Sequence, residues 1–244
     1  MVTKCLNTDL QSFWDNGFLI IENAISSNQL HALKVDFINW VNDSCAFDSS
    51  FGETIDGRHR FDVEIGHKST SPALRRISSP QEISSSYLDV MRNNKALDVL
   101  TKLYGPNIIF NNAKVNTKLP GSATKVKYHQ DFLFEPHSND DLAAVLIFLD
   151  DVTDTNGPLE VVPGSHRGPL FDHWHDGVFT GAISDSIYED IRHKVIPCTG
   201  SAGSACIMHT RLLHGSAANN STQPRTLYIV SYAAEDAVPL IPNN

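Results

Sequence analysis

The stretch Tyr128-His129-Gln130-Asp131-Phe132 decides how the chain is interpreted, because it places an imidazole and a carboxylate two residues apart in a segment that resembles a β-strand. Side chains at positions i and i+2 of a strand project from the same face. We therefore expect His129 and Asp131 to hold one metal ion, with Gln130 turned to the opposite side. By itself the tripeptide is weak evidence. The chain has 11 His and 28 Asp plus Glu, and a polar strand face in water would look the same.

A third ligand has to come from elsewhere, and His214, eleven positions before Arg225, is the best candidate. Two His and one carboxylate that leave other positions open are the ligand set of non-haem Fe(II) oxygenases. His173 and His175 are a rival pair, also two residues apart. Their surroundings, residues 169–181, have a loop-like composition, so we predict a cover near the mouth of a site there instead.

The segment 107–119 is predicted to be a strand with one polar face. Its polar side chains alternate with Ala113, Val115 and Thr117, and they are Asn112, Lys114, Asn116 and Lys118. On an outer surface such a face is unremarkable, whereas inside a barrel it would line a pocket. Further short strands are predicted over residues 142–149, 159–162, 194–197, 204–209 and 226–232, with turns at 156–158 and 163–165. Many short strands without alternating helices favour a jelly roll.

The first part of the chain has a different pattern. A helix is predicted over residues 8–17, with Thr8 as its cap, then a strand over 18–22 and a helix that begins at Ser26-Ser27. Residues 45–80 have few apolar repeats and are predicted to be mostly irregular. Another helix is predicted over 80–104, ended by Gly105-Pro106.

The predicted fold class is mainly β with flanking helices around a double-stranded β-helix core, a cupin-like jelly roll. We expect one domain, 1–244, with a helical lead-in over about 1–105 and the jelly-roll core over about 106–236.

Composition narrows the possible partners. The net charge of −9 and the absence of a Lys-rich or Arg-rich run argue against nucleic-acid binding. The four Cys have no CxxC spacing, and the sequence shows neither a leader peptide nor a membrane span, so a cytoplasmic protein that acts on a small molecule is expected. The sequence makes no prediction about oligomeric state.

Five blocks of the chain, taken in order, resemble the phytanoyl-CoA dioxygenase family of Fe(II)- and 2-oxoglutarate-dependent oxygenases. The blocks are 13–23, 118–122, 129–131, 156–166 and 209–216 with Asn219 and Arg225 after it. The resemblance implies an Fe(II) ion bound by His129, Asp131 and His214. It also implies that Arg225, helped by Ser216 and Asn116, holds the cosubstrate 2-oxoglutarate, and that O2 is the oxidant.

The resemblance leaves the substrate open. We expect hydroxylation of an unactivated C–H bond of a small molecule, such as a natural-product intermediate, and candidate substrate-binding residues are Asn112, Lys114, Arg76 and His209. His209 is also a less favoured alternative to His214 as a ligand. Desaturation or cyclisation by the same machinery, a non-catalytic jelly-roll binding module and a metal-dependent hydrolase are the alternatives. Halogenating relatives have a small residue at the position of Asp131, so a halogenase is not expected.

Overall fold

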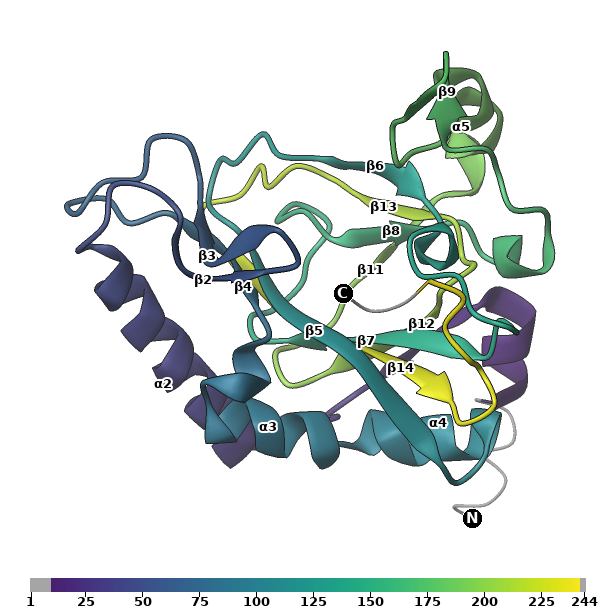
Figure 1. The fold of residues 1–244 in the computed structure, drawn as a ribbon, viewed down its shortest axis with the longest axis horizontal. Helices are drawn as coiled ribbons and strands as arrows, with labels where there is room; N and C mark the ends of the chain where they lie inside the picture. The colour runs from purple at the N-terminus through teal and green to yellow at the C-terminus, as the bar shows by residue number, and fades with distance from the viewer. Residues whose placement is uncertain (1–9, 242–244) are drawn as a thin grey trace.

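The computed structural model describes residues 10–241 of the protein. Its largest element is an antiparallel sheet with the strand order β1-β12-β7-β14-β5-β4-β3-β2 (Figure 1). The strands of this large sheet are β1 (Phe18–Ile21), β2 (Phe51–Ile55), β3 (Arg58–Val63), β4 (Leu74–Ser78), β5 (Ile108–Lys118), β7 (Leu142–Phe148), β12 (Ala205–His209) and β14 (Arg225–Ala234).

A second, smaller antiparallel sheet has the order β11-β8-β13-β6 and lies above the large sheet in Figure 1. Its strands are β6 (Val126–His129), β8 (Leu159–Val161), β11 (Ile196–Cys198) and β13 (His214–Ser216). Apolar side chains from both sheets, among them Leu146 and Val161, form one buried cluster between them. Two sheets that face each other in this way confirm the predicted jelly-roll core.

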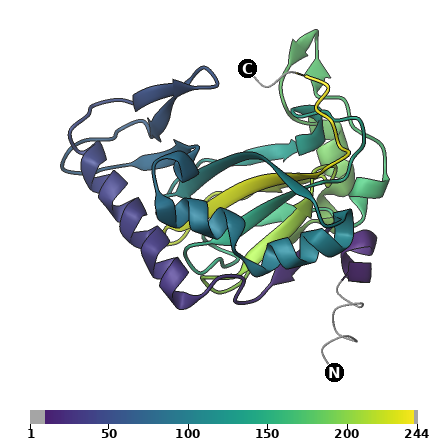
Figure 2. The same ribbon diagram turned by 60° about the horizontal axis from the view of Figure 1, so that its bottom comes forward.

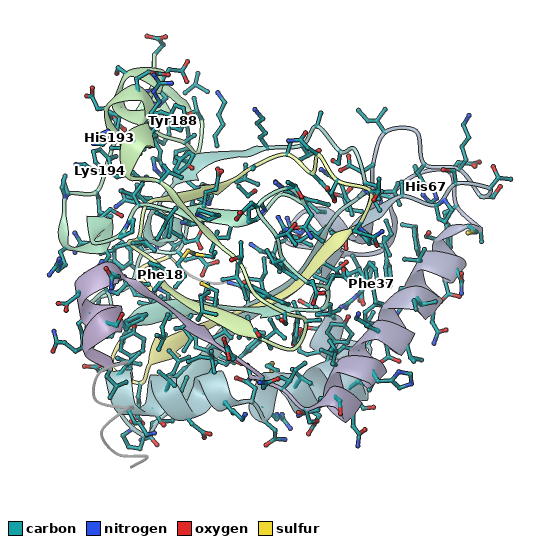
Figure 3. The ribbon with its side chains drawn as sticks, turned by 180° about the vertical axis from the view of Figure 1, so that it is seen from behind. Phe18, Phe37, His67, Tyr188, His193 and Lys194 are labelled. Atoms are coloured by element: carbon teal, nitrogen blue, oxygen red, sulfur yellow. The ribbon has the colours of Figure 1, made fainter. Side chains whose placement is uncertain are left out.

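Three helices cover the outer face of the large sheet (Figures 1 and 2). They are α2 (Ser27–Ser44), α3 (Ser85–Arg92) and α4 (Lys95–Tyr104). The predicted start of α2 is confirmed, since the Ser26 hydroxyl accepts a hydrogen bond from the Gln29 N–H and the Gln29 side chain returns to the Ser26 N–H. Figure 3 shows Phe37 on the side of α2 turned toward the sheet, where it packs against the main core.

The two faces of strand β5 line different parts of the interior, namely the core beneath the helices and the space between the two sheets. Ala113 and Val115 are buried in the core beneath the helices, and Thr117, also buried, bonds to Thr226 on β14. Lys114 and Lys118 point the other way, into the space between the sheets. The alternation predicted from the sequence is therefore present, and its polar face lies inside the barrel.

The region 45–80 differs from its prediction as irregular chain, because β2, β3 and β4 extend the large sheet beyond β5. Their exposed positions carry Gly, Glu, Thr, Arg and His, which hide the strand pattern. The intervening loop is tied to the end of α2 by His67, whose ring lies 3.0 Å from the carbonyl oxygens of Ser44 and Phe47 (Figure 3).

Two further predictions need correction. The helix expected over 80–104 is interrupted, because Asn94 caps a new helix with its side chain on the Leu97 N–H. The segment 169–181 is not wholly a loop, since β9 (Trp174–His175) and β10 (Val178–Phe179) form a hairpin beside α5 (Asp185–Ile191). Figure 3 marks this corner of the molecule with Tyr188.

At the start of the described chain, residues 10–16 are helical and Gly17 follows with a φ of +83, as expected for a helix end. The proposed cap Thr8 lies outside the described residues. No helix within residues 10–241 is long and apolar enough to span a bilayer.

Candidate metal centre

Three side chains converge at one end of the small sheet. His129 is the last residue of β6 and His214 the first of β13, and they lie opposite each other in the antiparallel ladder. Asp131 begins a 3-10 turn, so the predicted strand ends earlier than expected. Because Gln130 between them keeps an extended conformation (φ −122, ψ 120), Asp131 still lies on the side of His129. One ligand atom from each of the three residues lies within 4.8 Å of the others.

The orientation of both rings suits metal binding. Nδ1 of His129 lies 2.8 Å from the carbonyl oxygen of Lys127, and Nδ1 of His214 lies 2.9 Å from that of Leu212. A proton on Nδ1 that is donated to a carbonyl leaves the Nε2 lone pair free for a metal. The Nε2 atoms lie 3.2 and 3.6 Å from Oδ1 of Asp131. Two imidazole nitrogens and one carboxylate oxygen fit Fe(II).

The charges of the triad are balanced within it. Burial, helped by His129, lowers the pKa of His214 to about 4. Burial opposes the charge on Asp131, but His214 and His129 outweigh it and hold the pKa of Asp131 below its usual value. Burial likewise disfavours charge on His129, whose pKa is nevertheless raised by Asp131. A bound cation would take the place of that proton, as metal ions do at histidine sites.

A cavity of about 280 Å³ lies beside the triad and extends between the two sheets. One wall is the small sheet, from His214 to Ser216. The other wall is the polar face of β5, with Lys114, Asn116 and Lys118. The polar face therefore lines a pocket that also contains the metal ligands.

Two buried cations lie together in this cavity. Arg225, only 4% exposed, and Lys118, 6% exposed, are opposite each other on β14 and β5. Nε and Nη2 of Arg225 donate to the carbonyl oxygen of Gly157, at 2.9 and 2.6 Å. Nζ of Lys118 donates to Oγ of Ser216 at 2.7 Å and to the carbonyl oxygen of Ala217.

No carboxylate within the described chain forms an ion pair with either cation. Burial lowers the pKa of Arg225 to about 10, and burial together with Arg225 lowers the pKa of Lys118 to about 7. Two unpaired cations held by main-chain carbonyls are arranged to receive an anion.

Comparison of the sequence with protein families shows to which family the chain belongs. The family described as Phytanoyl-CoA dioxygenase (PhyH) matches residues 13–227. The chain belongs to the phytanoyl-CoA dioxygenase family. This match covers most of both sheets and includes the whole triad, so the family expected from the sequence, and with it the class of 2-oxoglutarate-dependent oxygenases, is confirmed.

Individual relatives differ in the substrates that they are named for. The "Probable alpha-ketoglutarate-dependent hypophosphite dioxygenase" of Stutzerimonas stutzeri is 33% identical over 235 residues, which cover 95% of this chain and 79% of that protein. The "L-proline trans-4-hydroxylase" of Streptomyces griseoviridis is 28% identical over 200 residues, covering 73% and 74%. The crystal structure of EctD from S. alaskensis with bound Fe superposes with a TM-score of 0.75 at 21% identity, over 93% of this chain and 76% of that one, which shows the shared fold.

The structure places only some of the remaining cosubstrate and substrate candidates in this cavity. Asn116, Lys114 and Arg76 line the cavity with the triad. Asn112 does not, since its side chain donates to Glu135 and lines an adjoining cavity. His209 also lies elsewhere, because it is on the opposite face of β12, buried against Phe13 and His166.

Sequence reasoning missed Lys118 as a site residue, although it was placed on the polar face of the same strand. Its position opposite Arg225 depends on strand register, which the sequence does not state. The rival pair His173 and His175 belongs to no group of three possible metal ligands within residues 10–241, and the ring of His175 bonds to the carbonyl oxygen of Ala182. Among residues 10–241 the triad is the one cluster with metal-ligand geometry.

Proposed function

We propose that the protein is an Fe(II)- and 2-oxoglutarate-dependent oxygenase that hydroxylates an unactivated C–H bond of a small molecule. The observation that carries the proposal is the single cavity in which a two-His, one-carboxylate triad and the buried pair Arg225 and Lys118 occur together. Such a cavity offers a metal to one end of a dicarboxylate and positive charge to the other.

Each residue has a distinct task. His129, Asp131 and His214 would hold the ion, which with 2-oxoglutarate and O2 supplies oxidising chemistry and releases succinate and CO2. The guanidinium of Arg225 would grip the far carboxylate. Its Nη1 has no hydrogen-bond partner within residues 10–241, and its other nitrogens are fixed on Gly157.

The alternatives explain less of the cavity. A metal-dependent hydrolase needs a general base beside its metal, but it has no use for a buried Arg-Lys pair next to it. A non-catalytic binding module would not need all three ligands in place. Desaturation and cyclisation would use the same residues, so the product distinguishes them from hydroxylation.

The relatives support the oxygenase class and a small-molecule substrate, because their names include hypophosphite and L-proline. These names are too different to transfer to this chain. A natural-product intermediate belongs to the same broad class of small molecules.

The test combines binding and turnover. Anaerobic protein should develop a metal-to-ligand absorption band when Fe(II) and 2-oxoglutarate are both present, and admission of air should release succinate only with 2-oxoglutarate. If neither signal appears in protein that has bound iron, the proposal fails. Mass spectrometry in saturating chloride should then give a product heavier by one oxygen atom, because Asp131 occupies the ligand position that a halogenase leaves vacant. A halogenated main product would exclude Asp131 from the metal.

A further inference from the structure

Two cations at the other end of the cavity have no ion-pair partner within residues 10–241. Arg76 on β4 lies opposite Asn116 on β5, and Lys114 is two residues from Asn116 on the same face. Diagonal neighbours of this kind on paired strands have Cα atoms about 7–8 Å apart. Two long cationic side chains at that spacing reach one small ligand.

Arg76 and Lys114 differ in this respect from two neighbouring arginines on β3 and β4. Arg60 forms ion pairs with Glu53 and Glu82, and Arg75 forms one with Asp62 at 2.6 Å. Arg58 also lines the cavity without an ion pair in the described chain, but it is exposed. Within residues 10–241 neither Arg76 nor Lys114 forms an ion pair or a side-chain hydrogen bond, and Nε of Arg76 is buried without a partner.

Unpaired charge at a half-buried position has a cost. Burial, together with Arg58 and Arg75, lowers the pKa of Arg76. A charged group removed from water destabilises the protein unless an opposite charge or a hydrogen bond compensates. The wall of the metal cavity also carries the carboxylates Asp62, Glu64 and Asp131. Asp62 is paired with Arg75, Glu64 is half-buried and accepts a hydrogen bond from Thr124, and Asp131 belongs to the triad. Glu135, on the adjoining cavity, accepts hydrogen bonds from Asn111 and Asn112.

The position of the pair indicates which ligand it serves. Lys114 is near enough to the triad to act electrostatically on His129, Asp131 and His214. It is four residues from Lys118, or about 13 Å along the strand, so the two lysines are at opposite ends of the wall.

Arg76 and Lys114 also line the adjoining cavity of about 890 Å³. The pair therefore lies where the metal cavity meets a second opening. That is the side from which a substrate would approach, because the other end is lined by the buried residues Arg225 and Lys118.

We propose that Arg76 and Lys114 form an oxyanion subsite and that the substrate is a small molecule with a carboxylate, phosphonate or sulfonate group. This inference rests on the proposed oxygenase function. The metal cavity itself, about 280 Å³, is at the lower limit for ligand pockets and is shared with the cosubstrate, which favours a small substrate. Because the net charge of the chain is −9, a local group of unpaired cations supports an anion-binding role more strongly than it would in a basic protein.

The experiment measures binding of simple anions by calorimetry to protein that holds Fe(II) and 2-oxoglutarate without air, and to metal-free protein. The probes are propanoate, methylphosphonate and methanesulfonate, with propanamide as the uncharged isostere of propanoate. We expect at least one anion to bind and propanamide not to bind. Arg76→Gln and Lys114→Met should each weaken that anion by about 10-fold or more, as expected for loss of a charge-assisted hydrogen bond.

Matched controls remove the same charge elsewhere. Arg92→Gln on α3 and Lys102→Met on α4 change exposed residues far from the cavity and should leave anion binding unchanged. Thermal unfolding of all four variants verifies that they are folded.

Three results would overturn the subsite. These are equal binding of propanoate and propanamide, equal weakening in the control variants, and a raised 2-oxoglutarate midpoint in Arg76→Gln and Lys114→Met with anion binding intact. The last would assign the pair to the cosubstrate. Failure of the oxygenase proposal is recognised separately, because the iron and 2-oxoglutarate band would then be missing from the wild type while the metal-free arm still reports on the anion.

Discussion

The two walls of the cavity are fixed in different ways. On the metal wall each histidine ring is oriented by a carbonyl two residues earlier in the chain, Lys127 for His129 and Leu212 for His214. On the opposite wall Arg225 is fixed by a carbonyl 68 residues away. Lys118 on the same wall is held by Ser216 and Ala217, 98 and 99 residues away. The ring orientations on the first wall are therefore set by local contacts, whereas the hydrogen bonds of the second wall form only when the two sheets are joined.

Because of this difference, the two walls determine different properties of the site. Local hydrogen bonds set the direction of a metal ligand almost independently of the rest of the fold. Long-range hydrogen bonds set the distance between the cation pair and the metal, which determines the length of ligand that fits. Variants of the metal wall should therefore affect iron itself, while variants of the cation wall should affect the cosubstrate and leave iron in place.

The largest effect is expected for Asp131→Ala. It removes the one carboxylate of the triad, and loss of even an outer partner of a metal ligand costs 10–100-fold in affinity at typical sites, so we expect more than about 100-fold weaker iron binding and no turnover. Iron content and succinate release of the purified variant are the measurements.

Asp131→Asn is the matched variant, since it keeps the shape of the side chain and removes its charge. It should retain the fold and still lose most of its iron. Wild-type iron content in both variants would exclude Asp131 as a ligand.

An intermediate effect is expected for Arg225→Met on the opposite wall. Loss of one partner of a buried, charge-assisted contact costs about 2 kcal/mol or more, equivalent to about a 30-fold higher 2-oxoglutarate midpoint. Iron content should stay near that of the wild type. Titration of the absorption band with 2-oxoglutarate reports the midpoint.

Arg225→Lys separates charge from shape, because it keeps a cation but loses the planar fork. Its midpoint should lie between those of the wild type and Arg225→Met. If all three midpoints coincide, Arg225 does not contact the cosubstrate.

The contrast between local and long-range contacts also explains which parts of the fold and of the site could be predicted from the sequence. The triad was predictable because His129 and Asp131 are neighbours in the chain and His214 belongs to a recognisable block. Strand β5 was predictable because Ala113, Val115 and Thr117 alternate in the sequence with polar residues from Asn112 to Lys118.

Other features depend on pairing between distant segments. Strands β2 to β4 were missed because they are stabilised by pairing with one another and, through β4, with β5, and not by their own composition. Lys118 was missed for the same reason, since only its register with Arg225 creates the pair. The turn at Asp131 follows from the contact of Phe132 N–H with the Thr210 carbonyl, another long-range hydrogen bond.

The smallest effect concerns a proton on Lys118. Its pKa of about 7 in the cosubstrate-free protein results from burial and the charge of Arg225. A carboxylate brought next to Lys118 favours its charged form and raises this pKa. Binding of 2-oxoglutarate should therefore take up about half a proton at pH 7, close to one at pH 8 and almost none at pH 6. The affinity for 2-oxoglutarate should accordingly fall above pH 7, by less than about tenfold per pH unit.

Calorimetry of 2-oxoglutarate binding to metal-loaded protein, in pairs of buffers with different ionisation enthalpies, measures this uptake at each pH. Loading the metal first removes the triad histidines from the titration, since their Nε2 atoms are then occupied. Lys118→Met should abolish the uptake, whereas Lys127→Met, which removes an exposed lysine of β6, should leave it unchanged. Proton uptake that persists in Lys118→Met would assign it to another group. Absence of uptake in the wild type at pH 8 would mean that the cosubstrate carboxylate does not reach Lys118, and that Arg225 anchors it without the lysine.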